Sequence, residues 1–238
     1  MKKVIIIGAT SGIGKELGKM FSQNDYVVGI VGRRSELFPE LQKEFHTEVY
    51  FKHIDVAKTS EAMNLLSELI KEMGGVDVIV ISSGVGFINP DLNWEKEKET
   101  IDVNVSGFTA MANVAFKYFC KEGTGQIVGI SSIAAIRGSG DSPSYNASKA
   151  FMSNYLEGLR QKVCKMGIPV TITDIQPGFV DTTMAKGEGL FWVASPEKAA
   201  MQIFKVVESK KKHAYITKRW CIVAWLLRII PDWLYNKL

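Results

Sequence analysis

The sequence predicts an α/β fold: a single-domain, doubly wound parallel sheet of about seven strands with helices on both faces. Three observations support this prediction. Short runs of β-branched and other apolar residues alternate along the chain with longer segments of helical periodicity. The strand runs are almost continuously apolar, as expected when helices cover both faces of a parallel sheet. Glycines at 74, 75 and 167 stand where helices should end.

The individual elements follow this alternation in order. We predict strands at the apolar runs 4–7, 26–31, 49–54, 78–81, 127–130, 170–175 and 214–216. We predict helices after Gly14 and over residues 59–73, about 96–121, 145–166 and 196–209. Ser195-Pro196 is a good start for the last of these, because a hydroxyl N-cap precedes a proline at the first helical position.

Composition and charge limit the class of protein. The chain has 238 residues, of which 46% are hydrophobic and 23% are charged, and no stretch is long and polar enough to be a linker. We therefore expect one domain, with a catalytic body over 1–217 and an apolar helical extension over 218–238. The net charge is only +4, and no aromatic residues interleave with the basic run 210–213, so nucleic acid is not an expected partner. His46, His53 and His213 lack metal-ligand spacing, so no metal site is predicted.

The cysteines and the first residues predict a cytoplasmic protein. Cys120, Cys164 and Cys221 lie far apart and form no CxxC pair, which is typical of buried, reduced thiols. Residues 1–7 superficially resemble a signal peptide. The apolar run nevertheless lasts only four residues before Gly8 and no cleavage site follows, so we interpret it as the first strand.

A glycine-rich turn, Gly8-Ala9-Thr10-Ser11-Gly12-Ile13-Gly14, follows this strand directly. Glycines let the backbone turn sharply and approach a pyrophosphate, and the helix that follows offers free N–H groups and the positive end of its dipole. Such a turn is weak evidence alone. Between the first strand and the first helix it predicts a Rossmann-type dinucleotide site.

The end of the second strand indicates which dinucleotide is bound. An NAD site has a carboxylate there for the ribose 2′-hydroxyl, whereas a 2′-phosphate requires arginine. This strand ends in Gly32-Arg33-Arg34, so we favour NADP(H) over NAD(H), although both arginines could simply face solvent. Asp55-Val56, after the third strand, could place a carboxylate on the adenine amino group, or Asp55 could cap the next helix.

Tyr145-Asn146-Ala147-Ser148-Lys149 is the most informative segment for chemistry. Residues four apart share one helix face, so the Lys149 ammonium can approach the Tyr145 phenol. A nearby positive charge favours phenolate and lowers a pKa that is otherwise about 10. Alternatively, Lys149 snorkels beside a half-buried tyrosine. Ser132, at the end of the fifth strand, could donate a hydrogen bond to a substrate carbonyl.

Together these residues resemble the short-chain dehydrogenase/reductase family over about residues 3–217. The matching motifs share the order expected of that family: Gly8-x-x-x-Gly12-Ile13-Gly14, Asp55-Val56, Asp102-Val103-Asn104, Ser132, Tyr145-x-x-x-Lys149 and the segment 177–182. The resemblance implies that Tyr145 is the acid/base and that Ser132 holds the substrate oxygen. It also implies that Lys149 bonds the nicotinamide ribose and lowers the tyrosine pKa.

The same resemblance implies further roles. Asn104 would anchor a water that relays protons to Lys149, although without the family it could equally be a helix residue bonding its neighbours. The nicotinamide side would be lined by Pro177, Gly178, Val180 and Thr182, and the remaining cofactor contacts would come from Ser83, Gly84 and Val103. Two departures stand out: Ile7 replaces the usual threonine, and 81–84 reads Ile-Ser-Ser-Gly in place of Asn-Asn-Ala-Gly. We expect changed local hydrogen bonding but intact catalysis.

The predicted function is therefore an NADP(H)-dependent oxidoreductase that interconverts a carbonyl and a primary or secondary alcohol. The alternative is a catalytically silent NADP(H)-binding regulatory or scaffold protein. Residues 183–193 occupy the position of a substrate lid, and their large apolar residues suit an apolar small molecule, although 190–193 could equally be core. By resemblance we expect a homodimer or homotetramer.

The C-terminal segment 220–235 is unusually apolar. It is too short to span a bilayer and is interrupted by Arg228, Pro231 and Asp232. Three alternatives remain open at this point. The segment packs on its own domain or a partner subunit, lies peripherally on a membrane surface as part of the extension 218–238, or covers the substrate cleft.

Overall fold

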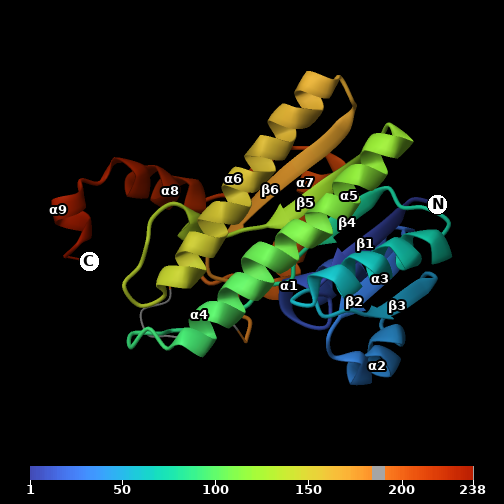
Figure 1. The fold of residues 1–238 in the computed structure, drawn as a ribbon, viewed down its shortest axis with the longest axis horizontal. Coiled ribbons are helices and arrows are strands. Elements are labelled where there is room, and N and C mark those ends of the chain that lie inside the picture. The colour runs from blue at the N-terminus through green and yellow to red at the C-terminus, as the bar shows by residue number, and fades with distance from the viewer. Residues whose placement is uncertain (184–190, 238) are drawn as a thin grey trace.

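The computed structural model describes residues 1–183 and 191–237, and within them a seven-stranded parallel sheet has the order β3-β2-β1-β4-β5-β6-β7 (Figure 1). Its strands are β1 (Lys3–Ile7), β2 (Val27–Gly32), β3 (Val49–His53), β4 (Val78–Ile81), β5 (Gly125–Ile130), β6 (Val170–Pro177) and β7 (His213–Ile216). This confirms the predicted fold class. The strand order reverses between β1 and β4, so the crevice for a ligand is expected at their carboxyl ends.

Helices cover both faces of the sheet (Figure 1). One face carries α3 (Thr59–Glu72), α5 (Phe108–Glu122) and α6 (Pro143–Met166), and the other carries α1 (Gly12–Ser22), α2 (Phe38–Gln42) and α7 (Pro196–Glu208). Successive strand residues point to opposite faces, so Ile5 belongs to one core and Val4 and Ile6 belong to the other. Burial on both faces explains why the strand runs are continuously apolar.

The helix predicted over 96–121 is divided in the structure. It consists of α4 (Trp94–Ile101), a π-helical turn (Asp102–Gly107) and α5. Such turns insert an extra residue into a helix and are frequent at functional sites. A side chain at Gly107 would come within 2.9 Å of Val56, so the turn packs closely on the segment after β3.

Helix α6 starts at Pro143, two residues before its predicted start. Ser142-Pro143 repeats the start pattern of Ser195-Pro196, which does begin α7, and the Ser195 hydroxyl accepts a hydrogen bond from Lys198 N at 3.3 Å. The pattern was therefore available in the sequence for both helices. The short 3-10 turns at Ser35–Leu37 and Ile133–Ala135 were not predicted.

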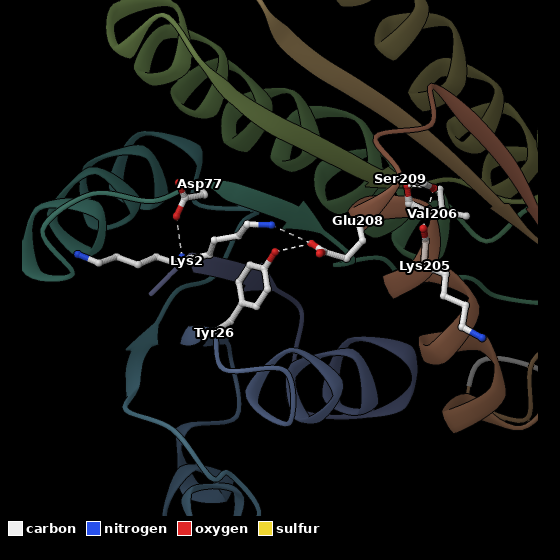
Figure 2. A network of polar contacts seen from close by, with 8 residues as sticks. Lys2, Tyr26, Asp77, Lys205, Val206, Glu208 and Ser209 are labelled. Carbon is white, nitrogen blue, oxygen red and sulfur yellow. Dashed lines mark hydrogen bonds and ion pairs between the residues drawn. The ribbon is translucent and has the colours of Figure 1, made fainter.

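At the amino ends of the strands a polar network holds α7 against the sheet (Figure 2). Tyr26 donates a hydrogen bond of 2.5 Å to Glu208, and Lys2 lies 3.4 Å from the same carboxylate. Burial, reinforced by the Glu208 hydrogen bond, raises the pKa of Tyr26 to about 12. Asp77 accepts a hydrogen bond of 2.7 Å from Lys3 N, which ties β4 to β1.

The chain ends in α8 (Trp220–Ile229) and α9 (Asp232–Tyr235), which extend away from the sheet (Figure 1). Trp220 and Ala224 are buried with Ile133 in a third, small apolar cluster, so α8 packs on its own domain along one side. No helix in the described ranges is both long and apolar enough to cross a bilayer. The prediction of buried thiols is wrong for Cys164 and Cys221, which are exposed because they lie on the outer sides of α6 and α8.

Candidate active site

The glycine-rich turn brings the backbones of β1 and β4 into direct contact. Gly8 has a φ of +87° and Gly12 a φ of +55°, both in the left-handed region that favours glycine. A β-carbon at Gly8 would stand 2.5 Å from Ser83 N. The turn therefore accepts only glycine at residue 8, and it begins directly beside Ser83.

The first turn of α1 is open to an anion. Ser11 is its N-cap but makes no side-chain cap, and no acidic residue lies in the first turn. Arg34 lies beside it, with Nη2 donating to Thr10 Oγ1 at 2.9 Å and to Ser11 Oγ at 2.6 Å. Arg33 points elsewhere and lies 3.9 Å from Glu99 of α4. The structure thus brings Arg34, but not Arg33, to the glycine turn.

Asp55 and Val56, which follow β3, make contacts within the protein itself. Asp55 Oδ1 accepts a hydrogen bond of 3.1 Å from Ala57 N and so closes the turn before α3, whose N-cap is Lys58. Val56 and Val103 are buried in the same apolar core. Asp55 therefore stabilises the turn that leads into α3, which is close to the alternative in which it caps that helix.

The segment after β4 lies between the glycine turn and α6. A β-carbon at Gly84 would stand 3.4 Å from both Asn104 Oδ1 and Lys149 Nζ. The Ser83 hydroxyl is buried and has no hydrogen-bond partner among residues 1–183 and 191–237. Ile7 and Ile81, which replace the polar residues usual in the resembling family, are buried in the core. Apolar packing therefore occupies these two positions.

Asn104 is fully buried in the π-helical turn and joins three elements. Its Oδ1 accepts from Val85 N at 2.9 Å, and its Nδ2 donates to Val85 O at 2.8 Å and to Ser148 Oγ at 3.0 Å. Ser148 in turn donates to Tyr145 O at 2.7 Å. Asn104 therefore bonds the loop after β4 and the helix that carries Tyr145 and Lys149, and not only its neighbours in the chain.

Lys149 is 5% exposed, and its Nζ donates a hydrogen bond of 3.0 Å to Ile130 O at the end of β5. Burial lowers the pKa of Lys149 to about 8, because the low-dielectric interior disfavours the charged form. The carboxylate of Asp174 acts in the opposite direction. The ammonium is thus buried, held by a main-chain carbonyl and easily deprotonated.

Tyr145 lies in the same place, but its pKa differs from the expectation. Burial raises the pKa of the phenol, and the hydrogen bond with Ser132 only partly opposes this shift. Lys149 Nζ is 5.7 Å from the centre of the Tyr145 ring and is directed to Ile130 O. The structure therefore does not show the predicted depression of the tyrosine pKa by Lys149.

Ser132 lies between the ends of β5 and β6. Its hydroxyl accepts from Ala134 N at 3.1 Å and donates to Pro177 O at 3.5 Å. Its side chain lies close enough to Tyr145 to lower the pKa of the phenol. The sequence-predicted trio of Ser132, Tyr145 and Lys149 is therefore brought together.

Sequence reasoning missed Asp174, a fully buried carboxylate on β6. Ser131, at the end of β5, donates to its Oδ1 at 2.5 Å, and Ser153, one turn beyond Lys149 on α6, donates to its Oδ2 at 2.5 Å. Asp174 therefore clamps α6 to the end of β5. The single acid in the strand run 170–177 was the feature that could have revealed it.

The segment after β6 closes the other side of the site. Thr182 meets the glycine turn, because a β-carbon at Gly12 would lie 3.1 Å from its methyl group. Val180 is 4% exposed and forms a β-bridge with Ala194. Gly178 lies under the indole of Trp220.

An aromatic cluster stands beside this segment. The Trp220 ring stacks on Phe191 with centroids 5.1 Å apart and meets Phe179 edge to face at 5.3 Å. Residues 184–190 of the predicted lid lie outside the described residues. Phe191, Trp192 and Val193 are exposed by 41–48%, so the core alternative for this end of the segment is wrong.

Comparisons with known proteins agree with this arrangement. An uncharacterised oxidoreductase of Myxococcus xanthus is 32% identical over 188 residues, which cover 77% of this chain and 74% of the relative. The closed form of serine dehydrogenase complexed with NADP+ has a TM-score of 0.77 at 25% identity and covers 86% of this chain and 88% of its own. A short-chain dehydrogenase from Sphingobium yanoikuyae in complex with NADPH has a TM-score of 0.81 at 19% identity, covering 98% and 97%.

The model of the short chain dehydrogenase family matches residues 2–190, which is most of the chain and includes the glycine turn, Asn104, Ser132, Tyr145 and Lys149. The chain therefore belongs to the short-chain dehydrogenases, a family of oxidoreductases.

Proposed function

We propose that the protein is an NADP(H)-dependent oxidoreductase that interconverts a carbonyl compound and a primary or secondary alcohol, with Tyr145 as acid/base. The observation that carries this proposal is the meeting of three side chains at the carboxyl end of β5. Ser132 interacts with Tyr145, and Lys149, one helical turn from Tyr145, bonds the last carbonyl of that strand. This is where an open α/β sheet binds its ligand.

The choice of NADP(H) is supported by the phosphate end of the crevice. The uncapped N-terminus of α1 offers N–H groups to a pyrophosphate, and the Arg34 guanidinium beside Ser11 suits a ribose 2′-phosphate. No carboxylate stands at the end of β2 to prefer NAD(H). The serine dehydrogenase similar to this chain was solved with NADP+. The partnerless hydroxyl of Ser83 is a further group that a polar ligand would satisfy.

We assign the nicotinamide half of the cofactor to the end of the crevice that lies away from Arg34. Gly84 lies close to Asn104 and Lys149, so a ribose bound beside Gly84 would be near the Lys149 ammonium. The segment from Pro177 to Thr182 lies across from it and meets the glycine turn through Thr182.

In the proposed reduction, Tyr145, Ser132 and Lys149 each have a separate role. When bound, the reduced cofactor supplies the hydride that the carbonyl carbon accepts. The Tyr145 phenol gives its proton to the carbonyl oxygen, which takes the electron pair of the C=O π bond, and Tyr145 remains as phenolate. Ser132 donates a hydrogen bond to the same oxygen, and the charge of Lys149 stabilises the phenolate.

The protonated form of Tyr145 suits its proposed role as the acid in reduction. Because burial raises this pKa, the phenol is protonated at neutral pH and ready to act as an acid. Oxidation would require the phenolate, which the buried site disfavours. The exposed ring of Phe191, which is supported from beneath by the buried Trp220, suits an apolar substrate.

The test is a panel of aldehydes, ketones and secondary alcohols, followed at the absorbance of reduced nicotinamide with each cofactor. We expect NADPH to be consumed with apolar carbonyl compounds and NADH to be used much more slowly. Binding of NADPH without turnover of any carbonyl would instead favour the catalytically silent alternative.

A further inference from the structure

A second pocket lies outside the crevice, on the solvent side of α7. One stripe of this helix, Lys198, Met201, Gln202 and Lys205, forms its floor at the spacing of i, i+3, i+4 and i+7. The loop between β7 and α8 forms the wall. The pocket is an open depression and not an enclosed cavity, with a volume of about 470 Å³.

The rim of this pocket is strongly positive. Lys198 and Lys205 stand on one side and Lys218 and Arg219 on the other, and no acidic side chain lines it within the described part of the chain. These four cations form no ion pair among residues 1–183 and 191–237. Figure 2 shows the Lys205 side chain directed away from the nearby Glu208. Arg219 donates a hydrogen bond of 3.1 Å to Trp192 O and lies over the Trp192 ring, which leaves Lys198, Lys205 and Lys218 as the cations available to an anionic ligand.

Two residues that line the pocket also carry buried polar atoms. Thr217 is 6% exposed, and its buried hydroxyl makes no hydrogen bond to any described residue. The same holds for Gln202 Oε1. Both atoms are shielded from solvent and lie beneath the pocket surface, so the charge of the rim is what indicates a ligand.

An exposed apolar stripe begins next to this pocket. Ile222, Trp225, Leu226 and Ile229 lie on the outer side of α8 and are exposed by 55%, 61%, 50% and 55%. Helix α8 is therefore apolar on its inner side, which packs on the domain, and on its outer side, which faces outward. A helix that is apolar all round is normally buried in protein or in lipid.

The charges around this stripe distinguish between two possible partners, a second copy of the chain and a lipid surface. Lys218 and Arg219 stand at its start and Arg228 near its end, and Asp232, the single acid in 218–237, is paired with Arg137 at 2.6 Å. A two-fold contact between copies of this chain would bring these cations together. An anionic lipid surface would instead neutralise them, and interfacial tryptophan is typical of membrane-surface helices.

We propose that this C-terminal face docks on an anionic phospholipid surface. The pocket between α7 and the β7–α8 loop binds the headgroup phosphate, and the outer stripe of α8 enters the interface. The inference does not depend on the proposed chemistry, because none of the pocket or stripe residues is placed in the catalytic or cofactor site.

The test is flotation of the full-length protein with vesicles of phosphatidylcholine, alone or mixed with phosphatidylglycerol. We expect binding only to the mixed vesicles. Lys198→Gln with Lys205→Gln should weaken it by about fivefold for each lysine. The matched control is Lys58→Gln with Lys71→Gln, two exposed lysines elsewhere. Trp225→Ser should reduce the blue shift of tryptophan fluorescence on binding, with the remainder coming from the exposed Trp233, whereas Trp94→Ser, at an equally exposed tryptophan on α4, should leave the shift unchanged.

Several outcomes would overturn the proposal. One is an absence of binding to the mixed vesicles. Another is unchanged binding by the Lys198/Lys205 variant, because the pocket would then play no part. A thermal shift with inorganic phosphate or glycerol phosphate in the absence of vesicle binding would assign the pocket to a free phosphate compound. A dimer in sedimentation that Trp225→Ser dissociates would assign the stripe to a second copy of the chain.

Discussion

The indole of Trp220 lies directly against Gly178, so that a β-carbon at residue 178 would stand 1.9 Å from Cε2 of Trp220. Gly178 follows β6 and belongs to the proposed nicotinamide side, whereas Trp220 opens the C-terminal helix α8. Trp220 is 2% exposed and stacks on Phe191. The C-terminal extension is thus part of the wall of the candidate active site and not a separate appendage.

This contact predicts that Gly178→Ala is costly. The added methyl group overlaps an indole that has no room to move, and overpacking of this kind costs about 1–3 kcal/mol of unfolding free energy. We expect a lower Tm and a lower kcat. Gly140→Ala is the control, because no atom lies within 4 Å of a β-carbon there. Equal Tm values for the two variants would show that Trp220 can move aside at no cost in stability.

Tyr145→Phe tests the acid/base directly. Loss of a general acid should reduce kcat by about 10²–10⁴-fold, while the dissociation constant for NADPH changes little. Tyr155→Phe is a matched control on the same helix, because Tyr155 packs on Phe108 and Phe151 away from Lys149. Turnover that survives in Tyr145→Phe would remove Tyr145 from the mechanism.

Arg34→Gln should separate the two cofactors. The guanidinium is placed beside Ser11, and a hydrogen bond to a charged group is worth about 1.5–3 kcal/mol, or about 10–150-fold in affinity. We expect NADPH to bind that much more weakly and NADH to bind about as before, as measured by fluorescence titration. Arg33→Gln should affect NADPH less, because Arg33 faces Glu99. A larger effect of Arg33 would place the 2′-phosphate on the α4 side.

Lys149→Met should raise stability at neutral pH while abolishing turnover. Burial lowers the pKa of Lys149 from 10.5 to about 8, so keeping it charged costs about 3 kcal/mol below pH 8. The variant also loses the hydrogen bond to Ile130 O, which should reduce this gain in stability by about 1 kcal/mol.

The gain in stability of Lys149→Met should become smaller as the pH rises above 8. Between pH 8 and 10.5 the unfolded chain holds the proton that the folded chain has released, so the stability of the wild type rises with pH. The difference in Tm between variant and wild type should therefore shrink over this window. A difference that stays constant from pH 7 to 10 would mean that Lys149 is not charged and buried as the structure indicates.

Much of the fold could be predicted because its causes are local. The apolar runs of β1, β4 and β6, the glycines at 8 and 12, and the start at Ser195-Pro196 act through neighbouring residues. The same is true of Tyr145 and Lys149, since four residues of helix place them on one face. The π-helical turn could not be predicted, because it is associated with bonds from Asn104 to residues 19 and 44 positions away.

By itself the sequence determined the alternation of strands and helices, the glycine turn and the identity of the reactive side chains, since backbone preference and helical spacing are properties of adjacent residues. Only the tertiary structure decided the pKa directions of Tyr145 and Lys149, the clamp at Asp174 and the packing of Trp220 on Gly178. Burial and the distance between charges depend on which distant segments the fold brings together, and no local pattern records them.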